Sequence, residues 1–328
     1  MAKDIGIDLG TSNVVIYMQK EGVVLNEPSV VDIDKERKRV VAVGKEANAM
    51  LGRTPGKVKT IKPIKDGVIA DFEITQIMLK EFINKINGKS SFIRPKILIC
   101  CPSNITQVEK NAIKEAALRA GAKKVFLEEE ARVAAIGMGM DINSPVASMI
   151  VDIGGGTTNI AVLSIGDIVI SQSIKIAGNT FDKDIKKYIK QKYKLLIGDK
   201  TAETIKIKIG TTDSKKEEKM EVKGRNLISG LPNTIQISSS EVAEAMKDSI
   251  KELIKSIKSV LEMTPPELSA DIVDKGLVLT GGGSLIDKLP ELLEKELKIP
   301  VVIAESPLTT VADGTGIILN NLNMLKEQ

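Results

Sequence analysis

One short pattern occurs twice in this chain, and it constrains the fold more than any other feature of the sequence. The segments Asp8-Leu-Gly-Thr-Ser-Asn13 and Asp152-Ile-Gly-Gly-Gly-Thr-Thr-Asn159 both read aspartate, apolar residue, glycine, hydroxyl pair and asparagine, with two additional residues in the second copy. Apolar runs flank each segment, which is typical of a strand, a tight turn and a second strand. An internal repeat of this kind predicts a fold built from two similar halves.

The repeated loops have the composition of phosphate-binding turns. Their glycines permit backbone conformations with positive φ and allow a ligand to approach the main chain. Several N–H groups can then point at one anion. A carboxylate beside a phosphate repels it unless a cation lies between them, so Asp8 and Asp152 suggest Mg²⁺. For either loop alone, a plain hairpin turn explains the residues equally well; the repetition favours phosphate binding.

Histidine is absent from the 328 residues, and this excludes several classes of enzyme. Without it the chain cannot build a Ser-His-Asp triad, an HExxH metal site or any other His-ligated metal centre. Carboxylates, hydroxyls and lysines remain as the available chemistry. The length is sufficient for two domains of ordinary size.

Charge and cysteine usage indicate a cytoplasmic protein that does not bind nucleic acid. The chain has 47 Lys and Arg against 43 Asp and Glu, a net charge of +4, and no basic patch interleaved with aromatic residues. The two cysteines, Cys100 and Cys101, are neighbours in a strand-like run, as expected for small apolar residues in a reducing compartment. No signal peptide and no apolar run of 18 residues is present, so we expect a cytoplasmic location.

Alternating strand-like and helix-like segments predict an α/β fold. We expect one half over residues 1–144, with a small subdomain at about 33–72, and a second over 145–328, with a small subdomain at about 182–240. The last helix, from about Thr310, is expected to return to the first half. Ligands in such folds lie at the carboxyl ends of strands. A third glycine cluster, Gly281 to Gly283, also follows a predicted strand and precedes a predicted helix, whose N-terminus could hold a phosphate or let a nucleotide lie against bare backbone.

These motifs, in this order, resemble the ATPase domain shared by actin, sugar kinases and Hsp70 chaperones. Within that superfamily the whole chain is most similar to the MreB family of bacterial actin homologues that determine cell shape. Ile99-Cys-Cys-Pro102 and Leu127-Glu-Glu-Glu130 look most like its Mbl branch. The motifs that carry the family resemblance are Gly6 to Thr11, Leu25 to Ser29, Gly52 to Gly56, Lys65 to Asp71, Asp152 to Thr158, Gly198 to Lys206, Thr264 to Leu268 and Leu279 to Gly283.

The resemblance implies an actin-like ATPase fold whose halves each contain a central mixed sheet, with ATP or ADP and Mg²⁺ in the cleft between them. Asp8 and Asp152 would hold Mg²⁺, largely through waters. The residues implied to contact the nucleotide are Thr11, Ser12 and Asn13 in the first phosphate loop, Gly154, Gly155, Gly156, Thr157 and Thr158 in the second, and Glu203, Thr204, Ile205 and Lys206 facing Gly281, Gly282, Gly283, Ser284 and Leu285 across the adenosine.

Motif position also implies a catalytic residue, Glu130, which would orient or activate the attacking water with Thr157 or Thr158 in support. The corresponding glutamate of the family directly precedes a proline, whereas Ala131 follows here. The carboxylate is kept, but a rigid turn is lost. The alternative is that the run of glutamates at 128–130 only matches the dipole of a helix predicted over Glu128 to Met138.

Phe92 and Ile93 lie beside Lys89 and Arg94 in a predicted loop, where the family has a hydrophobic membrane-binding loop. Apolar residues next to basic ones suit insertion into an anionic membrane surface. The alternative is a core contact that closes the loop, which is the more usual role of an isolated apolar pair.

We therefore expect a slow, Mg²⁺-dependent ATPase that polymerises into filaments, with paired protofilaments. The implied partners are further copies of the chain, the inner face of the cytoplasmic membrane and proteins of cell-wall elongation. A plasmid-partition ATPase would not need Phe92 and Ile93. A metabolite kinase of the same fold would need a second-substrate pocket with a catalytic base, for which the sequence offers no candidate motif.

Overall fold

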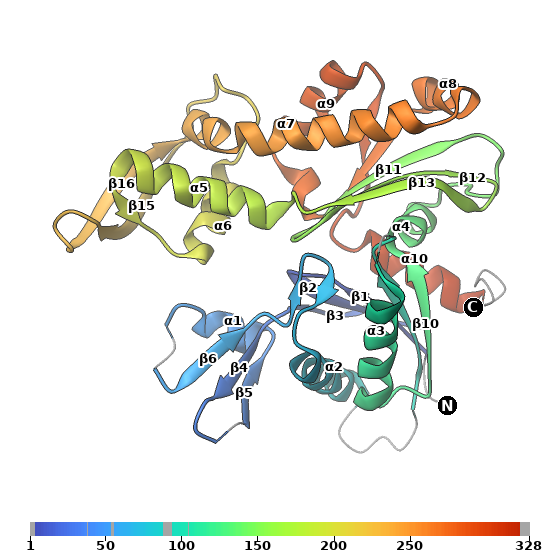
Figure 1. The fold of residues 1–328 in the computed structure, drawn as a ribbon, viewed down its shortest axis with the longest axis horizontal. Coiled ribbons are helices and arrows are strands. Elements are labelled where there is room, and N and C mark those ends of the chain that lie inside the picture. The colour runs from blue at the N-terminus through green and yellow to red at the C-terminus, as the bar shows by residue number, and fades with distance from the viewer. Residues whose placement is uncertain (1–3, 38, 54–55, 88–93, 104, 322–328) are drawn as a thin grey trace.

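The computed structural model describes residues 4–37, 39–53, 56–87, 94–103 and 105–321, arranged as two large parts that lie one above the other in Figure 1. Each part is built on a five-stranded sheet. The sheet of half I contains, in spatial order, β3 (Gly22–Pro28), β2 (Asn13–Met18), β1 (Ile5–Leu9), β9 (Lys96–Cys101) and β10 (Lys124–Glu129). The sheet of half II contains β13 (Asp167–Ile174), β12 (Thr158–Ser164), β11 (Ser148–Ile153), β17 (Leu277–Thr280) and β18 (Val301–Ile303).

The two sheets have the same topology. In each, the first three strands of the chain form an antiparallel meander, and two later strands add in parallel beside the first. The register places Asp8 opposite Cys100 of the adjacent parallel strand, and Asp152 opposite Thr280. The repeated sequence motif therefore reflects a repeated sheet topology. In each sheet, the aspartate of the motif lies near the carboxyl end of a central strand.

Small sheets extend both halves on the same side of the molecule, at the left of Figure 1. In half I, β4 (Val31–Asp34), β5 (Arg39–Val43) and β6 (Val58–Ile61) form one such sheet beside α1 (Lys45–Met50), and β7 (Ile64–Lys65) pairs with β8 (Val68–Ile69). In half II, β14 (Leu195–Leu196), β15 (Lys219–Asn226) and β16 (Pro232–Ser238) form the other.

The large sheets are covered by amphipathic helices. Half I carries α2 (Phe72–Asn87) and α3 (Gln107–Ala120), and half II carries α5 (Gly178–Tyr193), α6 (Asp199–Ile209), α7 (Ser239–Met263), α8 (Pro266–Lys275), the short 3₁₀ helix η1 (Gly282–Leu285) and α9 (Leu289–Leu297). Ser238 and Glu241 close a capping box at the start of α7, which fixes where this long helix begins. Each half encloses its own apolar core, and each core contains one fully buried phenylalanine, Phe82 or Phe181.

A third core joins the halves. It consists of α4 (Glu130–Gly137) and α10 (Thr310–Asn320) together with residues of both sheets, such as Leu98 and Ile150. The two helices cross so closely that a Cβ on Gly314 would lie 2.0 Å from the carbonyl oxygen of Val133. The last described helix of the chain thus packs on α4 and on β1 of half I, although it follows the strands of half II.

One boundary predicted from the sequence is wrong. Glu128 and Glu129 belong to β10, and α4 begins only at Glu130. The parallel pairing of Glu128 with Cys100 and of Glu129 with Cys101 continues the strand. Glu128 is also buried in an ion pair with Arg132, at 3.0 Å, so its charge is balanced by a side chain and not by the helix dipole.

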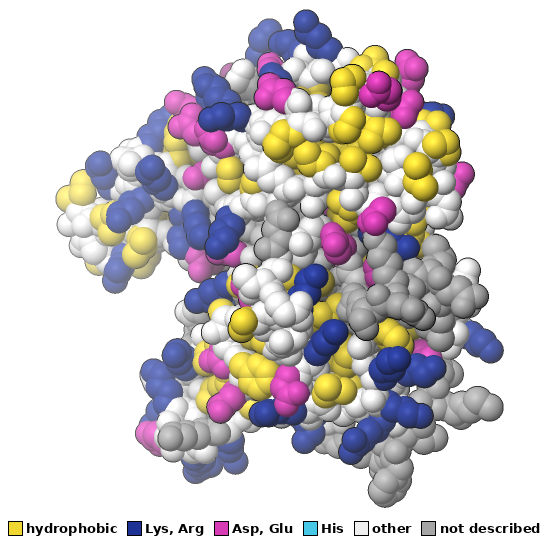
Figure 2. All heavy atoms as spheres, turned by 45° about the vertical axis from the view of Figure 1, so that its right-hand side comes forward, with side chains coloured by type: hydrophobic (Ala, Val, Ile, Leu, Met, Phe, Trp, Pro, Cys, Tyr) yellow, Lys and Arg dark blue, Asp and Glu magenta, His cyan; other side chains and the backbone are white. Residues whose placement is uncertain are grey.

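Phe92 and Ile93 lie outside the described residues. Among the described helices, none combines the length and the apolar character that a membrane-spanning segment needs. On the face drawn in Figure 2, basic side chains are scattered over both halves among acidic and uncharged ones, while apolar side chains gather on the upper half.

Candidate functional site

Three carboxylates meet where the halves join. Asp8 is near the end of β1, Asp152 is near the end of β11, and Glu130 is the first residue of α4. Burial, together with the charge of Asp152, raises the pKa of Asp8 to about 7, and burial also raises the pKa of Asp152 to about 7. Burial and the two aspartates raise the pKa of Glu130 well above its ordinary value. The topology therefore gathers negative charge in a poorly solvated volume.

This arrangement fits Mg²⁺. A divalent cation beside Asp8 and Asp152 would offset their repulsion and allow both to stay ionised at neutral pH. In the described part of the chain, no three His, Cys, Asp or Glu side chains are placed to bind one metal ion directly. Mg²⁺ does not require such a cage, since it keeps several waters and is usually held by one or two carboxylates and by substrate phosphates.

The two repeated loops are in direct contact. A Cβ on Gly155 would lie 1.9 Å from Oγ of Ser12, and one on Gly156 would lie 2.6 Å from Oγ1 of Thr11. The third glycine cluster is equally close, because a Cβ on Gly281 would lie 2.3 Å from Oδ1 of Asp152. All three glycine-rich segments identified in the sequence thus lie against neighbouring parts of this site, and a side chain at Gly155, Gly156 or Gly281 would clash with the facing residue.

Hydrogen bonds hold the second loop against half II. The N–H groups of Gly178 and Asn179 donate to the carbonyl oxygens of Gly154 and Gly155, at 3.1 and 2.8 Å. The Thr158 hydroxyl, fully buried, donates to the carbonyl oxygen of Ile176 at 2.6 Å. The proton of Thr158 is therefore already engaged, which leaves Thr157 as the better candidate to support a reaction.

Asn159 orients Glu130, a role that the sequence analysis missed. Its Nδ2 donates to Oε2 of Glu130 at 2.8 Å, across the junction between the halves. The equivalent asparagine of the first loop, Asn13, is exposed and donates instead to Oδ1 of Asn26 at 2.7 Å. The only sequence feature that could have indicated this role is the asparagine at the end of both repeats. Its bond to Glu130 restrains the carboxylate that lacks a following proline.

Of the four predicted adenosine-binding residues of α6, three have side chains that are at least partly accessible and one is buried in the core. Lys206 pairs with Asp182 at 2.9 Å and donates to the carbonyl oxygen of Gly178, also at 2.9 Å, so α6 lies beside the second loop. Glu203 is exposed and Thr204 is partly exposed. Ile205 is fully buried in the core of half II, so its side chain packs inward.

The opposite predicted wall is η1. Ser284 is fully buried and donates through Oγ to the carbonyl oxygen of Gly281 at 2.6 Å, which braces the turn. Leu285 is 54% exposed and is therefore free to contact a ligand. The structure brings Gly281 to the carboxylates, whereas Leu285 lies at the surface.

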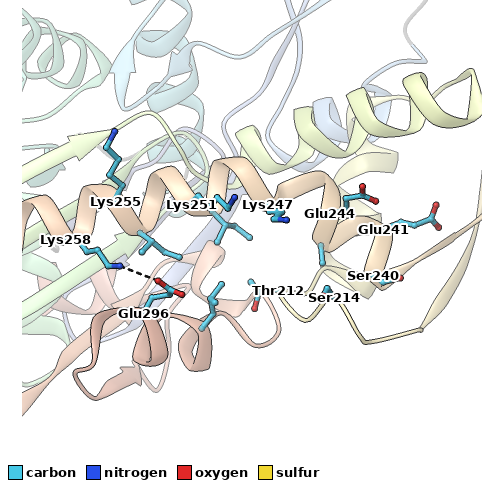
Figure 3. A pocket seen from close by; sticks show the side chains of 14 residues that line it. Thr212, Ser214, Ser240, Glu241, Glu244, Lys247, Lys251, Lys255, Lys258 and Glu296 are labelled. Atoms are coloured by element: carbon cyan, nitrogen blue, oxygen red, sulfur yellow. Dashed lines mark hydrogen bonds and ion pairs between the residues drawn. The ribbon is translucent and has the colours of Figure 1, made fainter.

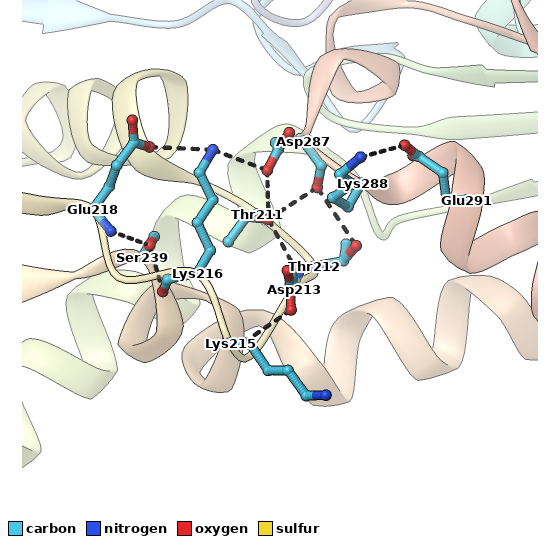
Figure 4. A network of polar contacts seen from close by, with 10 residues as sticks. All are labelled: Thr211, Thr212, Asp213, Lys215, Lys216, Glu218, Ser239, Asp287, Lys288 and Glu291. Carbon is cyan, nitrogen blue, oxygen red and sulfur yellow. Dashed lines mark hydrogen bonds and ion pairs between the residues drawn. The ribbon is translucent and has the colours of Figure 1, made fainter.

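Asp287 connects the two predicted walls (Figure 4). Its Oδ2 accepts from Thr211 Oγ1 at 2.8 Å and from Lys216 Nζ at 3.1 Å, and its carbonyl oxygen accepts from the N–H of Thr212 at 2.9 Å. Thr211 follows α6 and Asp287 follows η1, and Thr211 is fully buried. The hydrogen bond from Thr211 is the main cause that lowers the pKa of Asp287. One carboxylate thus holds together segments separated by 76 residues.

We expect Asp287→Asn to lower the free energy of unfolding by about 1–2 kcal/mol, because a charge-assisted bond to a buried hydroxyl is weakened. The control is Lys216→Ala, which removes only the partly exposed partner and should cost less than about 1 kcal/mol. Urea denaturation followed by circular dichroism measures both variants. Equal stability of Asp287→Asn and the unmodified protein would show that the contact does not join the two segments.

Comparison with known proteins gives matches over the whole chain. The family described as MreB/Mbl protein matches residues 2–327. The cell shape-determining protein Mbl of Bacillus subtilis is 57% identical, with 100% of this chain and 98% of the relative covered. The cell shape-determining protein MreB of Escherichia coli is 48% identical, with 98% and 95% covered.

Solved structures agree. MreB5 of Spiroplasma citri bound to AMPPNP has a TM-score of 0.94 and 40% identity, covering 98% of this chain and 97% of that one, and the same protein has been solved bound to ADP. The MamK double helical filament has a TM-score of 0.83 at 21% identity over 97% and 99% of the chains, which shows likeness of fold alone. The expected α/β, actin-like fold with two similar halves is confirmed.

Proposed function

The chain belongs to the MreB/Mbl family, and from this premise we propose that it is an actin-like ATPase that forms filaments and determines cell shape. Its filaments would organise the proteins of cell-wall elongation at the inner face of the membrane. The observation that carries the proposal is the meeting of three glycine-rich segments around Asp8, Asp152 and Glu130. The nucleotides bound in the MreB5 structures support ATP and ADP as ligands of this site.

The chemistry follows from the position of each group. Backbone N–H groups of the two loops, with Thr11 and Ser12 on one side and Gly155 and Gly156 on the other, would bind the phosphates, whereas the N–H of Gly154 already donates to the carbonyl oxygen of Thr157. Asp8 and Asp152 would hold Mg²⁺ through its waters, and the ion would supply charge stabilisation for phosphoryl transfer. Leu285 and Lys206 would contact the adenosine from opposite sides.

Glu130 would orient the attacking water and accept its proton. Burial raises its pKa, so it is a stronger base than an exposed glutamate. The amide of Asn159 keeps one carboxylate oxygen in place and leaves the other for the water. Because Glu130 belongs to half I and Asn159 to half II, this geometry exists only when the halves are correctly placed, which favours slow hydrolysis that responds to polymerisation.

The filament proposal is tested by the concentration dependence of turnover. We expect phosphate release per subunit, measured with Mg-ATP, to rise with protein concentration as sedimentable polymer appears. The reason is that contacts between subunits would hold the two halves in the relative position that hydrolysis needs. A metabolite kinase would instead respond to added sugars or carboxylic acids at constant protein concentration. Turnover that depends on such an acceptor and not on polymer would contradict the proposal.

Glu130→Ala should lower the rate of phosphate release by at least about 100-fold, the usual contribution of a positioned general base. ATP affinity, measured by fluorescence titration, should stay within a few-fold of the unmodified protein. The matched control is Glu129→Ala, one residue earlier and on β10, which should retain turnover. Full activity of the Glu130 variant would refute its catalytic role.

Membrane attachment would use Phe92 and Ile93, in the segment between α2 and β9. Two apolar side chains bind weakly, so stable attachment would require the multiple contacts of a filament. We expect Phe92→Ser/Ile93→Ser to reduce co-sedimentation of polymer with phosphatidylglycerol vesicles about tenfold. Val108→Ser, which changes an exposed apolar residue elsewhere on half I, is the control. Unchanged vesicle binding by the double variant would refute this attachment site.

A further inference from the structure

Half II contains a long groove that the proposed function does not use. It lies between α7 and α9, as Figure 3 shows, and has a volume of about 870 Å³. Apolar residues from both helices, Ala243, Ile250, Ile254 and Leu292, line it, and Thr212 and Ser214 close one end. We call this feature the α7 groove. None of the three carboxylates at the junction of the halves lines it.

Lysines follow the groove along α7. Lys247, Lys251 and Lys255 are spaced four residues apart, and all three are exposed. Like charges at this spacing destabilise a helix by about 0.2–0.5 kcal/mol per pair. Within the part of the chain that the structure describes, none of the three forms an ion pair. The helix thus presents three positive charges in a row along the groove.

Glu241 and Glu296 do not neutralise this row, because each is paired with another lysine, and Glu244 offsets only one of its three charges. Glu241 is bound by Lys192 and Tyr193, Glu244 accepts from Tyr188, and Glu296 pairs with the fourth lysine, Lys258, at 3.3 Å. The uncompensated charge of the α7 groove is therefore positive. The charge complement that it lacks is a set of carboxylates on another molecule.

The shape of the α7 groove indicates which kind of structural element would carry those carboxylates. The lining residues of α7 run from Ser240 to Lys258, about 27 Å of helix at 1.5 Å per residue. A groove of this length along α7, with apolar residues of α7 and Leu292 of α9 among its lining and cations along one side, matches a helix of about five turns that has one apolar and one acidic face. A flat membrane surface cannot reach the floor of a channel between two helices.

We propose that the α7 groove is a docking site for an acidic amphipathic helix of a partner protein. The apolar face of that helix packs against Ile250, Ile254 and Leu292, and its carboxylates pair with Lys247, Lys251 and Lys255. The proposal adds to the nucleotide-dependent function and does not rest on it. Loss of docking leaves ATP binding and turnover intact.

The test uses the full-length protein and a fluorescein-labelled 18-residue peptide with leucines at helical spacing and glutamates on the other face. We expect saturable binding by fluorescence anisotropy, and about tenfold weaker binding to Lys251→Glu/Lys255→Glu, because two attractions become repulsions. The matched control is Lys187→Glu/Lys190→Glu on α5, two exposed lysines outside the groove, with unchanged affinity. A peptide with lysine in place of glutamate should prefer the Lys251/Lys255 variant.

Circular dichroism and retained ATP binding establish that the variants are folded. Equal binding of the acidic peptide to both charge variants overturns the proposal, as does equal binding of a peptide whose leucines are replaced by serine. If phosphatidylglycerol vesicles need Lys251 and Lys255 while the peptide does not bind, the groove contacts lipid instead. Loss of Mg-ATP-dependent polymer in that variant, without peptide binding, assigns the groove to contact between copies of the chain.

Discussion

The rest of the structure depends on two aspartates that meet in a poorly solvated place at the junction of the halves. Asp8 and Asp152 occupy equivalent places in equivalent sheets, and burial raises the pKa of each to about 7. Such a pair is costly unless a cation lies beside it and anions approach that cation from the other side. The glycines allow Gly155, Gly156 and Gly281 to approach Ser12, Thr11 and Asp152 so closely that no side chain would fit there. Because these charges are unfavourable without a cation, the way in which the two halves come together depends on the ions that are bound between them.

The layer formed by α4 and α10 links the two halves, so it determines how a change at the two aspartates affects the rest of the chain. Its core is shared by both sheets, and Gly314 and Val133 leave no room for a side chain between the helices. Nε of Arg132 also donates to the carbonyl oxygen of Gly166, in the turn between β12 and β13, at 3.2 Å. Since Glu130 begins α4, a shift of half II displaces the proposed base together with the layer. The position of the proposed base and the relative position of the halves thus depend on the same packing.

The sequence predicted those features that local patterns encode, and missed those that depend on tertiary pairing. The two loops, the third glycine cluster and the two sheets follow from repeated motifs and alternating apolar runs. The bond from Asn159 to Glu130 could not be predicted, because it joins residues on different halves. The sequence predicted Glu128 at the start of a helix, whereas in the structure it pairs with Cys100 of the adjacent strand and forms an ion pair with Arg132. Ile205 sits within a ligand-binding motif, yet its position on the helix turns it to the core.

The α7 groove and the nucleotide site share one short segment. Thr212 and Ser214 line the groove, whereas the preceding Thr211 is bound to Asp287, which follows η1 beside the carboxylates. A helix that contacts Thr212 therefore lies one residue from the bond that holds the two predicted adenosine walls together. If that contact favours one arrangement of the walls, nucleotide and partner must change each other's affinity by the same factor. The fold thus provides a physical route by which a partner docked in the α7 groove, as proposed, would respond to the nucleotide state of a subunit without touching the nucleotide.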